Sequence, residues 1–371
     1  MVYLVTTQEE LFENELYTII SVDKSLEMMQ SWDVIQVDSE TDGRDPHLCD
    51  FLCFQFGNKS ADAQIVVDCS CIDIRLYKTL LESKFLIGQN LKFDLQFLYK
   101  YGIVPRNVYD TMIVEQLLYL GYPVAGKPGG ISYALNAIAQ RRLNIDIDKT
   151  VRGEIIWRGL DSSVIQYAAG DVTYLEDIRE SQLIDLKKKD CEKAAELENR
   201  FVPVISYLEW CGIKLDQEKW KEKMKQDQQN LNQSLEALNQ FTIKHPNLKQ
   251  FTYVDLQGDL FSGFNTEPVC IVNWSSSQQV IKIAKILGFN TETKDKKTGE
   301  SKDSVLEKAL SVQKGINDEF LKLYFAYQEY AKVVSSFGQG HLDAVNPLTG
   351  RIHSTFKQLG AASGKRNYHI C

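Results

Sequence analysis

The sequence predicts an α/β fold, a mixed sheet flanked by helices over residues 1–188, followed by a mainly helical segment over residues 189–371. Two observations favour this fold class. In the first part, short apolar runs, some with period-two alternation, are interspersed with helical patterns. Beyond Glu192 the pattern becomes long, charged and poor in β-branched residues, which suits exposed helices. The boundary is therefore expected near 185–195, at the lysine-rich stretch Lys187-Lys188-Lys189.

Each predicted element rests on a local pattern. Apolar, β-branched runs predict strands over 17–21, 34–41, 51–56, 64–68 and 108–109, and the early ones are expected to form an antiparallel meander. Helical periodicity predicts helices over 25–32, 76–82, 91–101, 111–120, 132–142 and 162–180. Asp110 suits the N-cap of the helix that follows it. A Gly/Pro-rich loop is expected over 121–130, and a charged helical arm over 217–241.

Composition limits the protein class. The chain has 371 residues, of which 44% are hydrophobic and 25% charged, and it has no apolar run of 18 residues that would suggest a membrane span. Eight scattered cysteines and the lack of a signal-like start predict a reduced, intracellular protein. The net charge of -8 disfavours a broad basic surface for duplex DNA, but it is compatible with a cleft that binds a few nucleotides.

Three acidic clusters stand within apolar segments of the first half. They are Asp38-Ser39-Glu40, the run from Gln89 to Asp94, and the run from Tyr167 to Asp171. Carboxylates in apolar surroundings need compensation, and divalent cations such as Mg²⁺ suit a set of hard oxygen ligands without histidine. A site with two such metals is suited to hydrolysis of phosphodiesters.

The local patterns place these side chains. Asp38 and Glu40 share one face of their strand, and Tyr167 and Asp171 share one face of a helix. Asn90 is expected to cap the helix that carries Asp94. Taken singly, the clusters would be read as a solvated pair, a capping arrangement and a buried tyrosine bonded to a carboxylate.

Together, the clusters resemble those of the DEDD exonucleases in their order, spacing and flanks. Tyr-x-x-x-Asp is the third motif of the tyrosine variant, and Gln166 stands where the histidine variant would need its histidine. The runs 88–94 and 167–171 are similar to the 3′–5′ proofreading domain of bacterial and phage family A DNA polymerases, the DNA polymerase I type. The resemblance implies a ribonuclease H-like exonuclease domain over 1–188, with a role in DNA replication.

The second half resembles the beginning of the polymerase domain of the same family. The resemblance is carried by residues 201–216, by the thumb-like stretches 273–288 and 294–310, and by 346–365. The palm with its metal-binding aspartates and the fingers do not follow, and after Lys365 the sequence no longer matches. We therefore expect a shortened, split or truncated polymerase that cannot polymerise DNA by itself.

The resemblance also implies roles for individual residues. Asp38, Glu40, Asp94, Tyr167 and Asp171 would be catalytic: Asp38, Glu40 and Asp171 would hold one Mg²⁺ or Mn²⁺ ion, Asp38 and Asp94 a second, and the Tyr167 hydroxyl would orient the attacking water. Contacts to the last nucleotides would come from Gln89, Asn90, Lys92, Phe93 and Arg44. Two of these depart from the family, because Arg44 stands where a leucine is frequent and Phe93 where a tyrosine is.

The predicted function is removal of nucleoside monophosphates from single-stranded or frayed 3′ ends of DNA, in the cytoplasm of a bacterial or phage-infected cell and without membrane contact. Two alternatives remain open: an RNA-trimming enzyme of the same chemistry, as in relatives of ribonuclease D, and a DNA-binding subunit completed by a separate palm-and-fingers chain.

Two competing signals are rejected. Gly121 to Lys127 has the spacing of a phosphate-binding loop, but Pro128 replaces the Ser/Thr of that motif and the segment follows a predicted helix. Cys49, Cys53, Cys69 and Cys71 lie on neighbouring strand candidates, but their spacing is not that of a zinc site.

Overall fold

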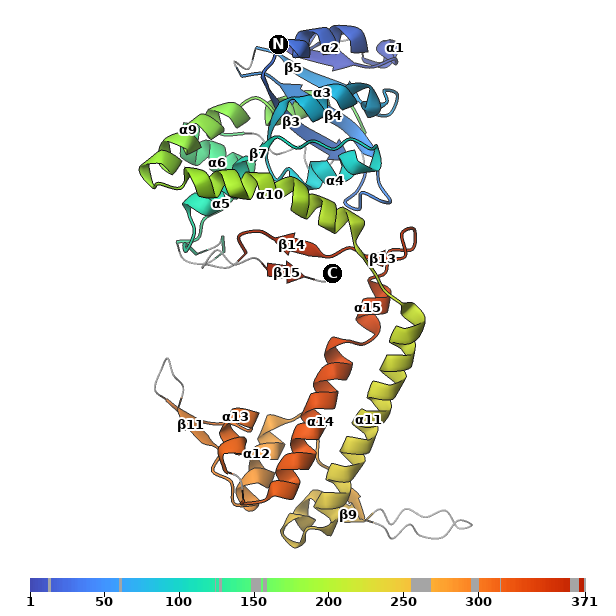
Figure 1. Ribbon diagram of the computed structural model, residues 1–371, viewed down its shortest axis with the longest axis vertical. Coiled ribbons are helices and arrows are strands. Elements are labelled where there is room, and N and C mark those ends of the chain that lie inside the picture. The colour runs from blue at the N-terminus through green and yellow to red at the C-terminus, as the bar shows by residue number, and fades with distance from the viewer. Residues whose placement is uncertain are drawn as a thin grey trace. The chain divides into compact units, whose positions relative to one another are not determined.

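The computed structural model (Figure 1) divides the chain into two compact units. Unit 1 comprises Met1–Lys214 together with Ala344–Cys371, and unit 2 comprises Leu215–Asp343. The structure describes all residues except 13–14, 60–61, 124, 127–128, 148–154, 156–158, 255–267, 295–299, 314, 361–366 and 370–371. The predicted match over 362–365 and the mismatched residues 366, 370 and 371 thus lie outside the described residues.

Unit 1 is built on a seven-stranded mixed sheet with the order β2-β1-β5-β4-β3-β6-β7. Its strands are β1 (Val2–Val5), β2 (Thr18–Ile19), β3 (Val34–Thr41), β4 (Phe51–Gly57), β5 (Gln64–Asp68), β6 (Phe85–Gly88) and β7 (Val108–Asp110). The strands β3, β4 and β5 form an antiparallel meander as predicted, whereas β6 is parallel to β3 and β7 is parallel to β6. The early strand predicted over 17–21 is not part of this meander, because β2 pairs in parallel with β1.

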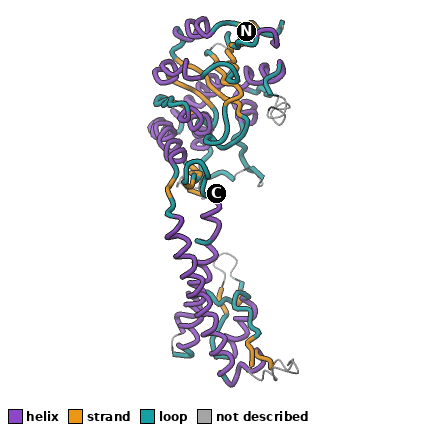
Figure 2. Tube along the Cα trace, turned by 90° about the vertical axis from the view of Figure 1, so that its right-hand side faces the viewer, coloured by secondary structure: helices purple, strands orange, loops and turns teal. Residues whose placement is uncertain are grey.

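Helices lie on both faces of this sheet, as Figures 1 and 2 show. They are α1 (Glu9–Phe12), α2 (Val22–Gln30), α3 (Lys78–Ser83), α4 (Lys92–Lys100), α5 (Thr111–Leu118), α6 (Leu135–Leu143), α8 (Ser162–Asp171), α9 (Leu175–Lys188) and α10 (Glu192–Cys211), with the 3₁₀ turn η1 (Ile74–Tyr77) before α3. Asp110 caps α5 as predicted, because its side chain accepts hydrogen bonds from the amides of Met112 and Ile113.

The alternation of β3 sorts its side chains between two different cores. Ile35 and Val37 are buried in the main core, together with residues of α2, α3 and α4. Asp38 and Glu40 point to the opposite face, on which α8 packs. The hydrophobic pattern of one strand therefore fixes the side of the sheet on which the carboxylates stand.

The residues that follow unit 2 in sequence return to unit 1. There β13 (Arg351–Ile352) pairs with β8 (Ile213–Lys214), and β14 (Thr355–Lys357) pairs with β15 (Asn367–His369). Gln358 donates hydrogen bonds to the carbonyl and the carboxylate of Glu198 on α10. The segment 344–360 is thus part of the structure that surrounds α10.

Unit 2 has a hydrophobic core of its own, between the long helices α11 and α14, which run side by side (Figures 1 and 2), and the shorter helix α12. Its elements are α11 (Gln217–Lys244), η2 (Pro246–Phe251), β9 (Thr252–Val254), β10 (Pro268–Cys270), α12 (Ser277–Ile286), β11 (Glu292–Lys294), β12 (Ser301–Asp303), α13 (Glu307–Leu310), η3 (Ser311–Gln313), α14 (Asp318–Ser336) and α15 (Gln339–Asp343). The helical arm predicted over 217–241 is thus confirmed as α11. Within the described residues, no helix combines the length and the apolar character needed to cross a membrane.

Candidate metal centre

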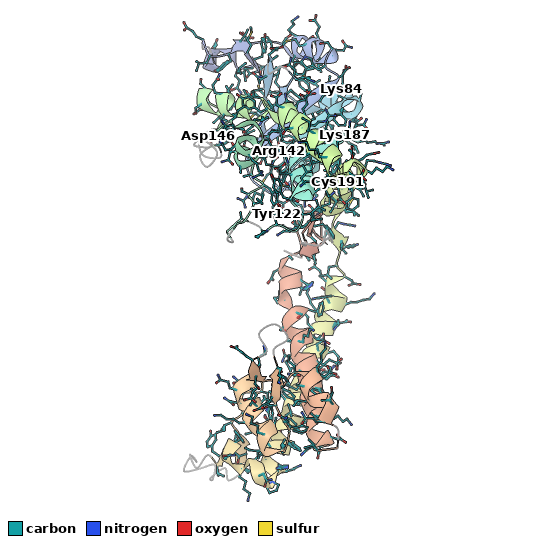
Figure 3. The ribbon with its side chains drawn as sticks, turned by 90° about the vertical axis from the view of Figure 1, so that its left-hand side faces the viewer. Lys84, Tyr122, Arg142, Asp146, Lys187 and Cys191 are labelled. Carbon is teal, nitrogen blue, oxygen red and sulfur yellow. The ribbon has the colours of Figure 1, made fainter. Side chains whose placement is uncertain are left out.

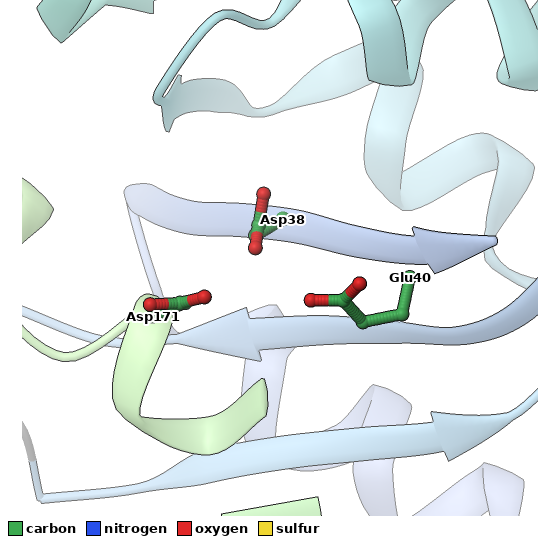
Figure 4. A group of neighbouring side chains, drawn as sticks. All are labelled: Asp38, Glu40 and Asp171. Atoms are coloured by element: carbon green, nitrogen blue, oxygen red, sulfur yellow. The ribbon is translucent and has the colours of Figure 1, made fainter. Parts of the chain in front are cut away.

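Three of the predicted carboxylates meet on one face of the sheet. Asp38 and Glu40 stand on β3, and Asp171 is the last residue of α8 (Figure 4). One carboxylate oxygen from each of the three lies within 4.8 Å of the others. Asp161 fixes the start of α8, because its carboxylate accepts hydrogen bonds from the amides of Ser163 and Val164, both at 2.9 Å.

The chemistry of this cluster suits a hard divalent cation. Asp171 is 4% exposed, whereas Asp38 and Glu40 are half-buried. Three carboxylates this close and this poorly solvated repel one another unless positive charge is placed among them. Clusters of carboxylate oxygens favour Mg²⁺ or Mn²⁺ over softer metals. The acidic cluster can therefore hold a metal ion.

Gln55 on β4 supports Asp38 and was not predicted from the sequence. It is fully buried, pairs across the sheet with Asp38 and donates a hydrogen bond of 3.2 Å from Nε2 to Asp38 Oδ2. The signal in the sequence is a polar residue between Phe54 and Phe56, in a strand that is otherwise apolar. Because this bond uses one carboxylate oxygen, it restricts the orientation of the Asp38 side chain.

The fourth predicted carboxylate, Asp94, occupies a different environment. It lies on α4, is 3% exposed and accepts a hydrogen bond of 2.5 Å from the hydroxyl of Ser39. Burial raises the pKa of Asp94 to about 7. The group of oxygens within 4.8 Å of one another comes from Asp38, Glu40 and Asp171. Asp94 lies beside this group, bonded to Ser39 between Asp38 and Glu40.

Tyr167 lies one helical turn before Asp171 on α8. Its side chain is 9% exposed and packs with Ile155 and Val164. The spacing of four residues puts Tyr167 and Asp171 on the same face of the helix, as predicted. The phenol ring is therefore held by packing close to the end of α8 that carries the carboxylate.

Gln89 and Asn90 form the turn between β6 and α4. The Gln89 amide donates to the carbonyl of Tyr133 at 2.8 Å and accepts a bond from the Thr111 hydroxyl. Asn90 has a φ of 61°, and its backbone amide donates to Asp110. The prediction that Asn90 caps α4 is wrong, because Leu91 is the N-cap residue and makes no side-chain capping bond. The left-handed turn at Asn90 places it before the cap position.

Lys92 is paired within unit 1. Its ammonium group contacts Glu209 of α10 and the carbonyl of Phe356 on β14, both at 2.7 Å. Glu209 is 5% exposed and also accepts hydrogen bonds from Gln96 and from the amide of Phe356. Glu209 was not predicted from the sequence, because its partners lie more than a hundred residues away in both directions.

Phe93 and Arg44 line a cavity of about 990 Å³ in unit 1. It lies between α4, α5, the residues 119–123 and the segment 355–360, and its wall includes Tyr119, Tyr122 and Lys357. Phe93 packs on Phe97 with 5.0 Å between the ring centroids, and Arg44 is exposed. Aromatic rings combined with basic side chains suit contact with bases and phosphates.

Comparison with known proteins agrees with this geometry. Residues 14–183 match the protein family described as 3′-5′ exonuclease. Over 363 residues the chain is 25% identical to DNA polymerase I of Aquifex aeolicus, a match that covers 92% of this chain and 54% of that protein. It is 27% identical over 297 residues to DNA polymerase I of Caldicellulosiruptor bescii, and this match covers 77% of this chain and 29% of that protein. The chain thus spans about half of the first relative's length, and less of the second's.

A shorter match connects the chain with an RNA enzyme. Over 101 residues it is 37% identical to ribonuclease D of Haemophilus influenzae, covering 27% of this chain and 23% of that protein. Residues 14–183 are thus similar to the 3′-5′ exonuclease family, and most of the chain is similar to part of DNA polymerase I.

The solved structures include the POL domain of Pol1 from M. smegmatis, in complex with DNA primer-template and dNTP. It is similar over 99% of this chain and 54% of that chain, with a TM-score of 0.67 and 16% sequence identity. A likeness at this identity establishes the fold alone. Together with the family match, it confirms the predicted fold class, a ribonuclease H-like exonuclease domain followed by a mainly helical segment.

Proposed function

We propose that this chain is a metal-dependent 3′–5′ exonuclease that removes nucleoside monophosphates from DNA 3′ ends, as in proofreading. One observation carries the proposal: Asp38, Glu40 and Asp171 converge within a domain of the 3′-5′ exonuclease family. Asp38, Glu40 and Asp171 would hold one divalent cation, and Asp38 with Asp94 a second. Bound cations would supply Lewis-acid stabilisation of the charge that develops on the phosphate and on the leaving 3′ oxygen.

The side chains of this domain provide positioning. Tyr167 is held on α8 beside Asp171, where its hydroxyl would orient the attacking water. Phe93 and Arg44 would contact the base and phosphate of the terminal nucleotides from the cavity wall. Gln89 and Asn90 are fixed by bonds to Tyr133, Thr111 and Asp110, so they would offer a rigid edge to the sugar. Lys92 would bind phosphate only after leaving Glu209.

DNA is the favoured substrate because of how much of the chain each match covers. The match to the Aquifex DNA polymerase I covers 92% of the chain, whereas the match to ribonuclease D covers 27%. The 37% identity of that shorter match favours RNA trimming as a second candidate. A DNA-binding role beside a separate palm-and-fingers chain is compatible with the first proposal, since the chain spans 54% of its Aquifex relative.

The experiment compares 5′-labelled DNA and RNA oligonucleotides of the same sequence, with Mg²⁺ and with EDTA. We expect single-nucleotide shortening of the DNA that needs Mg²⁺ and is absent in Asp94→Ala. The matched control is Asp62→Ala, which removes an exposed aspartate from the turn between β4 and β5. Equal activity of wild type and Asp94→Ala would refute the nuclease assignment. Faster shortening of the RNA than of the DNA would show that RNA is the preferred substrate.

A further inference from the structure

A second cavity of unit 1, of about 370 Å³, lies between α9, α10 and the edge of the sheet at β6 and β7. It shares no lining residue with the cavity that contains Phe93 and Arg44. Figure 3 shows this side of unit 1, with Lys84, Lys187 and Cys191 labelled; each is next in sequence to a residue of the cavity wall. The proposed nuclease reaction assigns no role to it.

Arg179 of α9 provides the cationic part of the wall. Its guanidinium carbon lies 5.2 Å from the ring centroid of Phe85 and 5.5 Å from that of Tyr109. The Nε atom is buried, and among the described residues it has no hydrogen-bond partner. A buried donor without an acceptor is costly, and in native proteins such a group calls for a specific explanation. An anionic ligand in the cavity would supply the acceptor.

Two further arginines stand in the same wall. Arg106 is exposed, and Arg200 is 77% exposed with Glu196 at 4.0 Å, which is the limit of an ion pair. Glu192 and Glu196 of α10 also line the cavity, so its wall includes three arginines and two glutamates. Planar guanidinium groups bind the oxygens of a phosphate through paired hydrogen bonds.

The rest of the wall combines apolar side chains, among them Val108, Leu183 and Leu186, with the polar residues Asn107 and Asn199. A volume of about 370 Å³ lies within the range of small-molecule sites, which runs from about 300 to 1,000 Å³. The combination of several arginines with apolar and amide side chains in one compact cavity fits a small organic phosphate that carries a flat ring. A single inorganic ion would leave most of this space and its apolar wall unused.

We propose that this cavity binds a nucleoside monophosphate, with its phosphate held by Arg179 and Arg106 and its nucleoside against the apolar wall. The choice of a nucleoside monophosphate among organic phosphates rests on the proposed function, since it is the compound that the exonuclease would release. Binding itself needs neither metal nor turnover. The two proposals can therefore fail separately.

The test is calorimetric titration of the full chain with dAMP in EDTA, where the carboxylate cluster lacks metal and repels phosphate. We expect one site that Asp171→Ala retains, and that Arg179→Gln weakens by at least about 10-fold. Arg106→Gln should also weaken dAMP binding. Because Arg106 is exposed, this variant should fold, and the test does not rely only on a variant of the partly buried Arg179. The control is Arg75→Gln, an exposed arginine paired with Asp73.

The proposal would be overturned by no binding of dAMP, by binding that is unchanged in both arginine variants, by binding lost in Asp171→Ala, or by orthophosphate binding as tight as that of dAMP. Displacement of dAMP by a single-stranded oligonucleotide that lacks a terminal phosphate would also overturn it, because the cavity would then be a contact for the DNA backbone. Because no step of this experiment measures hydrolysis, none of these results bears on the nuclease assay.

Discussion

At the scale of single residues, the four acidic side chains have two kinds of environment. Asp38, Glu40 and Asp171 form a close group, whereas Asp94 is buried and bonded to Ser39, and its pKa is raised to about 7 by desolvation. The three neighbouring carboxylates favour cation binding directly. Asp94 is connected to them by its hydrogen bond with Ser39, which lies between Asp38 and Glu40 on β3. The proposed second metal position therefore depends on a side chain that already has a hydrogen-bond partner.

Tyr167→Phe tests the role of one hydroxyl group. The ring remains packed against Ile155 and Val164, so the fold should persist, but the attacking water would lose its orienting partner. We expect kcat on single-stranded DNA to fall by roughly 10- to 100-fold with little change in KM. Tyr99→Phe is the control, since its hydroxyl bonds the carbonyl of Pro203 at 3.0 Å. A change in KM alone would show that Tyr167 binds substrate and does not orient water.

At the scale of elements, segment 344–360 is held to unit 1 by Glu209. Glu209→Gln removes the charge that Lys92 contacts and weakens the acceptor for Gln96 and Phe356. Hydrogen bonds to charged groups contribute roughly 1.5–3 kcal/mol each, so we expect a loss of unfolding free energy of that order and faster hydrogen exchange over 355–358. Urea unfolding and hydrogen exchange measure both effects.

The control is Glu218→Gln, which breaks an exposed pair with Lys221 and should change the unfolding free energy by less than about 1 kcal/mol. If both variants were equally stable, Glu209 would not be the residue that holds this segment.

We expect His47, whose ring packs on that of His353, to make the attachment of the same segment dependent on pH. Their ring centroids are 4.2 Å apart, and burial, with a smaller effect of His353, lowers the pKa of His47 although Asp45 opposes this. The unfolded chain then binds the proton more readily than the folded one. Stability should be full above about pH 6.5 and fall as the pH drops below it. Thermal unfolding between pH 5 and 7.5 should show this loss in the wild type and less of it in His47→Gln.

Local patterns determined most elements of unit 1, including β3 with its observed bounds and the capped helix α5. Local patterns did not predict the points at which the backbone geometry interrupts a helix. The helix predicted over 162–180 is two helices, α8 and α9, and the pattern from Glu192 to Phe241 is interrupted between Cys211 and Gln217, where Gly212 has a φ of 60°. A side chain at Gly212 would meet His353 at 2.8 Å, a contact that the local sequence does not reveal.

The site shows the same division between local and distant information. Asp38 with Glu40, and Tyr167 with Asp171, follow from the periods of a strand and a helix. Gln55, Ser39 and Glu209 were not predicted, because their roles depend on partners brought together by sheet pairing and by the return of segment 344–360. Pairings between distant segments leave no periodic signal in the chain.

At the scale of the whole molecule, unit 2 is inserted between two parts of unit 1. Ile352 pairs with Ile213 on one side and bridges to Val345 on the other. Ile213 and Val345 are therefore separated by two strand spacings, which puts the two ends of the insertion roughly 10 Å apart. A linker of about six Gly and Ser residues in place of residues 216–343 spans that distance.

We expect this shortened protein to unfold cooperatively and to retain hydrolysis of single-stranded DNA, because the carboxylates and their supports all lie in unit 1. Circular dichroism with thermal melting and the oligonucleotide assay measure the two properties. Loss of the cooperative transition would show that unit 1 depends on unit 2 for its fold.

The most direct test of the whole account is the anomalous scattering of Mn²⁺ in crystals of the wild type and of Asp171→Asn. We expect a strong peak among the carboxylates of Asp38, Glu40 and Asp171 in the wild type, with a second peak beside Asp94, and loss of the first peak in the variant. Wild-type crystals without density among these side chains, at a Mn²⁺ concentration that supports hydrolysis in solution, would contradict it.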